Sequence, residues 1–155
     1  MRRRRAPKRV VKVDPKYNSA VVGNFINIIM RAGKKSVSQK IIYDAFDLVS
    51  QRTKEDPLKV FFAALDNARP RMAVKPRRIG GATYQVPLEV TKDKGISIAL
   101  RWIKDFALKK KGRPMKVKLA DEIMAAYKRE GSAIKKKEDN HKMAEANRAF
   151  AHFRY

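Results

Sequence analysis

The side chains of this sequence with the clearest chemical potential are its cations, which fall in clusters. The chain carries 38 Lys and Arg against 15 Asp and Glu, a formal net charge of +23. Binding a phosphate backbone with release of its counterions needs little more than cations within reach. The clusters are Arg2, Arg3, Arg4 and Arg5 with Lys8, Arg9 and Lys12; Arg31, Lys34 and Lys35; Arg69, Arg71, Lys75, Arg77 and Arg78; Lys109, Lys110, Lys111, Arg113, Lys116 and Lys118; and Lys135, Lys136 and Lys137.

This excess of positive charge indicates a polyanionic partner. Like charges repel each other in a compact chain, and a surface built only for solubility rarely needs a net charge above about 8. Nucleic acid is the first candidate and an anionic membrane surface the second. The cluster at 109–111 also suits the dipole at a helix C-terminus, and the cluster at 135–137 is explained equally well as a solvated first turn. The N-terminal and 69–78 clusters have few acids nearby, which favours nucleic acid.

Other chemistry lacks the residues it needs. Without cysteine there is no disulfide, thiolate nucleophile or Cys-ligated zinc. His141 and His152 have no acids at ligand spacing, so we expect no metal site and rings that face solvent or RNA. The adjacent pair Asp121-Glu122 diverges on a helix, which predicts a solvated face. The 33–36 segment lacks the upstream glycine of a P-loop, and Gly80-Gly81 lacks the spacing of a dinucleotide site. We expect no catalytic residues and no cofactor.

Helical periodicity predicts the elements that position the cations. Apolar residues recur at helical spacing from Ser19, and Gly33 stands where a helix C-cap belongs. Ser36 with Gln39 predicts a capping box for the second helix. Asp56-Pro57 predicts the start of the third, with a buried stripe of Leu58, Phe61, Phe62 and Leu65, and Arg69-Pro70 predicts its end. Three further helical patterns run through 96–107, 119–127 and 132–150.

The segment 71–90 alternates apolar and polar residues around Gly80-Gly81, which predicts a β-hairpin. Pro76 and Pro87 exclude a central strand but suit a ribbon with free edges. Because two strands alone are marginally stable, we expect the ribbon to pack on the helices or on a partner. Tyr84 and the aromatic tail could stack on bases; an apolar ribbon face and a tail packed on the core are equally good interpretations.

The prediction is therefore a mainly α, single-domain protein of about six helices with a two-stranded β-hairpin protruding between the third and fourth. Residues 1–18 form a basic extended arm, 19–149 the helical domain with the ribbon at about 71–90, and 150–155 an aromatic and basic tail. The longest apolar run, Val60–Leu65, is far shorter than the roughly 20 residues that span a bilayer. The basic N-terminus has no apolar region behind it, so we expect a cytoplasmic protein.

Several long segments of the sequence resemble the bacterial small-subunit ribosomal protein seven family (uS7). The similarity runs through FINIIMRAGKKSVSQKIIYDAF at 25–46, EDPLKVF at 55–61, NARPRMAVKPRRIGGATYQVPLEV at 67–90, ALRW at 99–102 and GSAIKKKEDNHKMAEANRAFAHFRY at the C-terminus. It therefore covers nearly the whole chain in the same order.

The resemblance implies a structural protein that binds the 3′ major domain of 16S rRNA and nucleates assembly of the small-subunit head. It implies neighbouring small-subunit proteins as partners, tRNA at the exit site and mRNA nearby, no membrane and no homo-oligomer. The plastid stroma is the alternative location. The residues it places on rRNA are Arg3, Arg4, Arg5, Lys8, Arg9, Lys34, Lys35, Arg71, Lys75, Arg77, Arg78, Lys110, Lys111, Arg113, Lys116, Lys135 and Lys136. Those it places near the exit site are Gly80, Gly81, Tyr84, Arg148, His152, Arg154 and Tyr155.

Two rival classes predict different features. A DNA-bending protein also uses basic β-ribbons but often carries an apolar wedge such as proline at the tip, where this chain has Ile79-Gly80-Gly81-Ala82. A membrane-surface protein needs a basic amphipathic helix, whereas the charge here gathers at helix ends.

Overall fold

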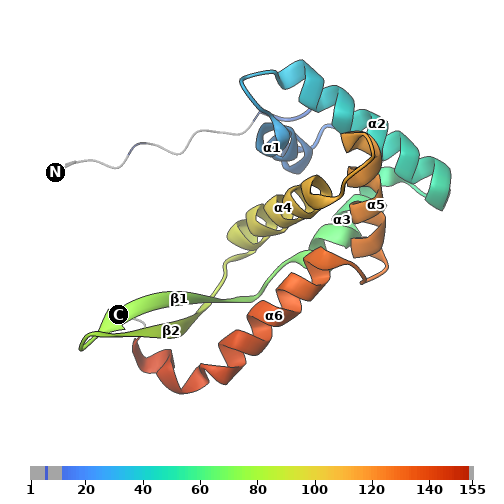
Figure 1. Cartoon of the computed structure of the whole chain (residues 1–155). Helices are drawn as coiled ribbons and strands as arrows, with labels where there is room; N and C mark the ends of the chain where they lie inside the picture. Colours follow the sequence, from blue (N-terminus) through green and yellow to red (C-terminus); the bar gives the residue numbers. More distant parts are fainter. Residues whose placement is uncertain (1–5, 7–11, 154–155) are drawn as a thin grey trace.

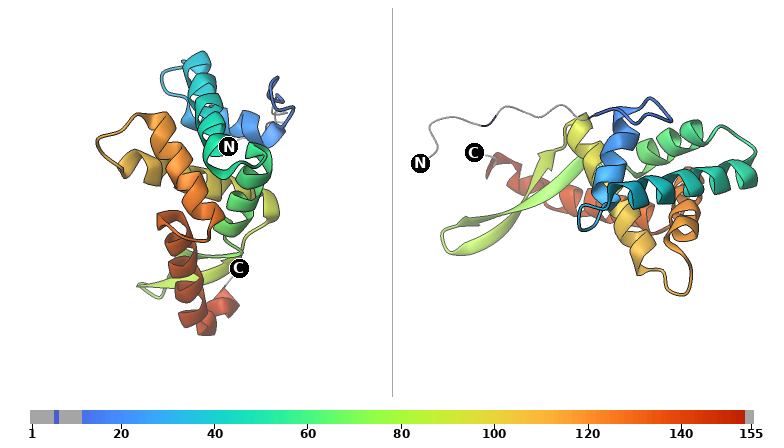
Figure 2. Two further views of the ribbon diagram at one scale, coloured as in Figure 1. Left: turned by 90° about the vertical axis from the view of Figure 1, so that its right-hand side faces the viewer. Right: turned by 90° about the horizontal axis from the view of Figure 1, so that it is seen from above.

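The computed structural model describes residue 6 and residues 12–153, and its order of elements matches the prediction. Six α-helices and one β-hairpin follow each other along the described chain (Figure 1), and a short 3₁₀ helix, η1, comes last. The bounds are α1 Ala20–Ile29, α2 Lys35–Thr53, α3 Pro57–Ala68, β1 Met72–Ile79, β2 Ala82–Glu89, α4 Lys92–Lys109, α5 Met115–Tyr127, α6 Ser132–Ala146 and η1 Arg148–Phe153. Helices α1 to α5 form a body from which the hairpin projects, with α6 beside it (Figures 1 and 2).

Local sequence signals explain both ends of α3. The Asp56 carboxylate accepts the Leu58 backbone N–H at 3.0 Å, which satisfies one of the free donors of the first turn. Pro57 is the first helical residue, a position that needs no backbone N–H. The helix ends at Ala68 with Arg69 extended, because the residue before Pro70 avoids the α region. The prediction for this helix is confirmed, except that Phe62 is 40% exposed.

The predicted boundary between α1 and α2 is wrong in detail. α1 ends at Ile29, and its cap is Met30, whose N–H donates to the Ile26 carbonyl at 3.0 Å. Gly33 lies in the following turn with φ +72°. Ser36 does not cap α2, because the helix already begins at Lys35. The N-cap residue is Lys34, whose side chain makes no capping hydrogen bond. A Ser inside the first turn no longer has the extended backbone that a capping side chain requires.

The core of the body is built around three fully buried phenylalanines. Phe25, Phe46 and Phe61 come from α1, α2 and α3 and are each 0% exposed. Phe61 stacks on Phe25 with ring centroids 5.4 Å apart and lies 5.0 Å from Phe46. α4 and α5 complete the core with mostly small and branched residues, namely Ala99, Leu100, Ile103, Ala107, Leu119, Ala120, Ile123 and Ala126.

The hairpin is antiparallel, and its register runs from Met72↔Glu89 to Ile79↔Ala82. Gly80 and Gly81 form the two-residue turn with φ +56° and +88°. Positive φ at both central positions is the feature of the turn type that matches strand twist in tight hairpins. The ribbon packs against α6 and η1 (Figure 2), which confirms the expectation that it packs on the helices.

The described end of the N-terminal segment is anchored on the body. Asp14 is 2% exposed and accepts the backbone N–H groups of Lys16 and Tyr17 and the hydroxyl of Tyr43, the last at 2.6 Å. Burial and the hydrogen bond to Asp14 raise the pKa of Tyr43 to about 12. Residues 15–17 form a turn, whereas the sequence predicted extended chain up to residue 18.

Candidate nucleic-acid interface

The two neighbouring arginines of β1 face different environments. Arg77 pairs across the hairpin with Tyr84, and Arg78 pairs with Thr83. Because successive side chains of a strand point to opposite faces, Arg77 shares the face of Tyr84 while Arg78 lies on the other. Arg78 is exposed and Arg77 half-buried. The sequence placed both on rRNA, but the structure offers Arg78 the more open approach to a polyanion.

The face of the ribbon that carries Tyr84 is covered by the C-terminal 3₁₀ helix. The Tyr84 ring lies 5.0 Å from that of Phe150 and 5.8 Å from that of Phe153, measured between centroids. His152 lies over Phe153 at 3.9 Å, and Arg148 is exposed at the start of η1. Of the two interpretations that the sequence left open for Tyr84, the structure favours an apolar ribbon face, because intramolecular ring contacts already use this side chain.

The remaining ribbon cations, Arg71 and Lys75, are exposed. Lys75 lies in β1 on the opposite face from Arg78, and Arg71 immediately precedes β1, so the charge follows the length of the hairpin. Gly80 and Gly81 are also exposed, at its tip. In this element the structure brings together the basic residues that the sequence singled out.

The α4–α5 loop and the start of α5 are more constrained than the sequence suggested. Lys110 pairs with Glu122 at 2.8 Å, Arg113 with Asp121 at 3.2 Å and Lys116 with Asp44 at 3.1 Å. Three of the four cations predicted here to bind rRNA therefore also hold helices together. The Arg113–Asp121 and Lys116–Asp44 pairs are partly open to solvent and contribute little stability, so phosphate can compete for these two cations.

Glu122 is buried, which contradicts the prediction of a solvated face for Asp121-Glu122. Its side chain is 2% exposed, ion-pairs with Lys110 and accepts the Ala133 backbone N–H at 3.3 Å. An acid at the N-terminus of α6 also matches the helix dipole. The prediction failed because it treated α5 in isolation, whereas the α4–α5 loop and the start of α6 both close over this position.

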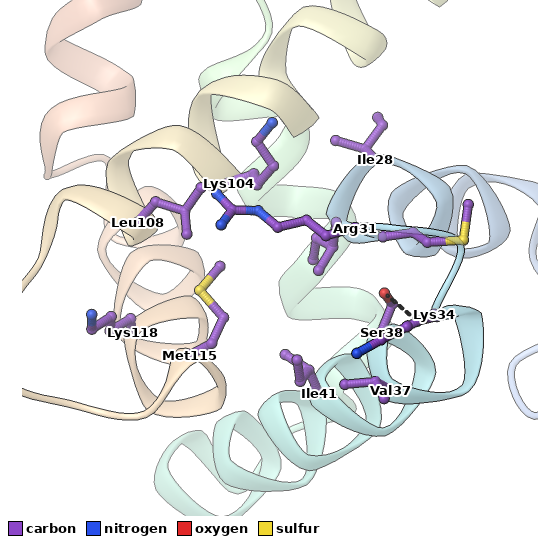
Figure 3. Close-up of a pocket in the computed structure, with 12 residues that line it drawn as sticks. Ile28, Arg31, Lys34, Val37, Ser38, Ile41, Lys104, Leu108, Met115 and Lys118 are labelled. Carbon is purple, nitrogen blue, oxygen red and sulfur yellow. Dashed lines mark hydrogen bonds between the residues drawn. The ribbon is translucent and has the colours of Figure 1, made fainter.

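The turn before α2 presents cations without acidic partners. Arg31, Lys34 and Lys35 are exposed, and no carboxylate of the described chain pairs with any of them. Figure 3 shows Arg31 and Lys34 on the edge of a hollow that Lys104 and Lys118 also line. The sequence showed Arg31 and Lys118 as members of separate clusters and did not point to Lys104, because only the tertiary fold brings α4 and α5 beside this turn.

The three consecutive lysines near the start of α6 have different surroundings. Lys135 and Lys136 are exposed, so they remain available to a partner. Lys137 instead donates to the Asn67 carbonyl at 2.6 Å. That bond links α6 to the end of α3.

His141 has a structural role instead of facing solvent or RNA. Its Nε2 accepts the backbone N–H groups of Arg71 and Met72, at 3.0 and 3.4 Å, and so ties α6 to the base of the ribbon. Burial, with added repulsion from Lys137 and Arg71, lowers the pKa of His141 below its usual value. The neutral ring is the form that can accept at Nε2, so geometry and electrostatics agree.

Several predicted contacts lie outside the described residues: Arg3, Arg4, Arg5, Lys8 and Arg9 at one end and Arg154 and Tyr155 at the other. Among the residues that are described, no three His, Asp or Glu side chains gather where they could hold a metal ion. None of the described helices is long and apolar enough to cross a membrane.

Comparison with known proteins identifies the family. Residues 1–148 match the family described as ribosomal protein S7p/S5e. The chain belongs to this family. It is 58% identical over 155 residues to the small ribosomal subunit protein uS7 of Thermotoga maritima, and 57% identical over 155 residues to that of Fervidobacterium nodosum, covering 100% of both chains in each case. The uS7 of Thermodesulfovibrio yellowstonii is 54% identical over 154 residues, 99% of each chain.

Membership in the uS7 family confirms the resemblance seen in the sequence. The family consists of structural ribosomal proteins and is not a family of enzymes. The match includes the ribbon, both basic turns and the whole of α6, so each described cation cluster falls within a segment that the family shares.

Proposed function

We propose that this protein is an rRNA-binding structural constituent of the small ribosomal subunit that binds the 3′ major domain of 16S rRNA. Binding there would nucleate assembly of the subunit head, with neighbouring small-subunit proteins adding to the same RNA. The bacterial relatives work on cytoplasmic ribosomes, and we assign this chain to the same compartment. The ribbon and η1 would lie beside tRNA in the exit site and beside the path of mRNA.

The observation that carries the proposal is the exposed positive charge along a projecting ribbon in a chain of the uS7 family. Arg78 and Lys75 are exposed on a hairpin that projects from the body. A projecting ribbon can follow a groove or a junction of folded RNA without disturbing the core. Arg adds planar, two-pronged contacts to phosphate or base edges that Lys cannot make.

The first experiment compares affinity for a transcript of the 3′ major domain with affinity for duplex DNA of equal length across a salt series. Specific rRNA binding should persist at salt concentrations that abolish DNA binding, with a slope reflecting roughly 6–10 phosphate contacts. Equal affinities and equal slopes would contradict the proposal. A preference for DNA would favour a DNA-bending protein, and flotation with anionic liposomes would favour a membrane-surface protein.

The second experiment tests the ribbon itself. Arg78→Ala and Arg77→Ala should weaken rRNA binding more than Lys109→Ala, and Arg78→Ala should do so without loss of thermal stability because its side chain is exposed. Lys109 is a suitable control because it lies at the end of α4 with its ammonium 5.1 Å from the Phe106 ring. Equal losses for Arg78→Ala and Lys109→Ala would remove the specific role of the ribbon.

A further inference from the structure

One hollow on the helical body combines an apolar wall with a cationic rim. It lies between the α1–α2 turn, α2, α4 and the start of α5, and its volume is about 410 Å³ (Figure 3). That volume lies within the range of small-molecule pockets.

The wall is apolar and partly open to solvent. Val37 in α2 is 53% exposed and Leu108 in α4 is 38% exposed, both among the few large apolar side chains exposed in the described chain. Figure 3 shows Met115 of α5 and Ile41 of α2 lining the same space. Exposed apolar side chains gathered in a concave site are typical of a groove that binds a ligand or a partner.

The rim is cationic on several sides. Arg31, Lys34, Lys104 and Lys118 line the hollow, and no acid lines it. Of these four, only Lys104 has an acidic partner in the described chain, its sequence neighbour Asp105 at 3.1 Å. The complementary ligand therefore has anionic groups at its edge and an apolar face at its centre.

We propose that this hollow binds one unstacked nucleotide of a single-stranded RNA segment, with the base against the apolar wall and the flanking phosphates on the rim. The proposal rests on the proposed function and names a subsite for it. Every base has an apolar face that packs on protein side chains, and such packing is tolerant of sequence. In Figure 3 the Arg31 side chain extends across the hollow, where its planar guanidinium can stack on the base and pair with phosphate.

RNA fits this site better than an acidic peptide because of what surrounds it. Lys35, exposed and without an acidic partner in the described chain, extends the cationic rim along the turn. Repeating phosphates meet such a row at regular intervals, whereas an acidic peptide would need several carboxylates at matching spacing.

The test uses two variants of the full chain with the same change of charge. Val37→Asp places an acid in the wall, and because Val37 is in the first turn of α2, the helix dipole favours a carboxylate there, so the fold is retained. Phe62→Asp is the control, since Phe62 is 40% exposed on α3 and does not line the hollow. The probes are a short single-stranded oligoribonucleotide and the same oligonucleotide with a central abasic ribose, followed by fluorescence anisotropy.

The wild-type chain should bind the intact oligonucleotide about fivefold or more tightly than the abasic one, because removing one base removes its stacking. Val37→Asp should abolish that difference, and Phe62→Asp should preserve it. Equal binding of the two oligonucleotides by the wild-type chain, or equal effects of the two variants, would overturn the proposal. Displacement of the RNA by a Glu-rich peptide without base discrimination would instead identify a protein-binding site and would also overturn it.

These outcomes are separable from the fate of the proposed function. Salt-resistant binding to the rRNA transcript without discrimination of the abasic probe would leave the proposed function in place and eliminate the subsite. Base discrimination that Val37→Asp abolishes, with no preference for rRNA over DNA, would support the subsite and refute the rRNA-specific function.

Discussion

The buried ion pair between Glu122 and Lys110 allows a sharp test of the fold. The Glu122 side chain is 2% exposed, while that of Lys110 is 39% exposed, with a separation of 2.8 Å. Lys110→Met would leave a buried carboxylate without its cation. Breaking a fully buried pair costs about 3–5 kcal/mol. Because Lys110 is partly in water, we expect a smaller loss in the free energy of unfolding, about 2–3 kcal/mol.

Urea unfolding at pH 7 is the assay, with the neighbouring Lys111→Met as the matched control. Lys111 is exposed and has no acidic partner in the described chain, so its replacement should change the unfolding free energy by less than about 0.5 kcal/mol. The double variant Lys110→Met with Glu122→Leu should recover at least part of the loss, because apolar replacement of a buried pair is often neutral.

Equal unfolding midpoints for Lys110→Met and Lys111→Met would refute the reasoning. They would mean that water reaches Glu122 in solution and that the carboxylate does not need its cation. If the double variant unfolds with a higher free energy than Lys110→Met alone, the two side chains interact, because replacing Glu122 then removes the carboxylate that had lost its cation.

Three further outcomes are expected from other contacts. The pKa of His141 is lowered in the folded chain, so the unfolded chain takes up this proton first as pH falls. The free energy of unfolding should therefore decrease below about pH 6.5, toward the folded-state pKa. His141→Gln should flatten this pH dependence, measured by urea unfolding at pH 7.5 and 5.5. Gly23→Ala should lower the melting temperature, because a Cβ there would lie 2.5 Å from the Lys12 carbonyl. Tyr84→Ala should release η1 from the ribbon, and faster proteolysis within 148–153 would show it, whereas unchanged cleavage would contradict the ring contacts.

Signals that act within a few residues predicted the fold well. Asp56-Pro57 and Arg69-Pro70 set both ends of α3, and Gly80-Gly81 set the hairpin turn, because each dictates backbone dihedrals directly. The prediction of a capping box at Ser36 was wrong because it depended on where the helix begins. A capping residue must lie outside the helix, and the sequence pattern did not show that α2 already begins at Lys35.

Contacts between distant segments account for most of what the sequence could not predict. Glu122 looks solvated on α5 alone, and only the loop from α4 and the start of α6 bury it. His141 is surrounded in sequence by polar residues, yet the base of the ribbon lies against it. The cationic clusters were recognisable as clusters, but which members pair with acids, as Arg113 does with Asp121, depends on how the helices pack.

The packing of α6 against the ribbon has a consequence for synthesis on the ribosome. The strands span Met72–Ile79 and Ala82–Glu89, while α6 and η1 occupy Ser132–Ala146 and Arg148–Phe153. The hairpin therefore leaves the exit tunnel before the helices that cover it have been made. Because an isolated two-stranded hairpin is marginally stable in water, the ribbon gains its support only after the last residues emerge. A chain released early would carry the basic strands of the hairpin without the helices that hold them in place.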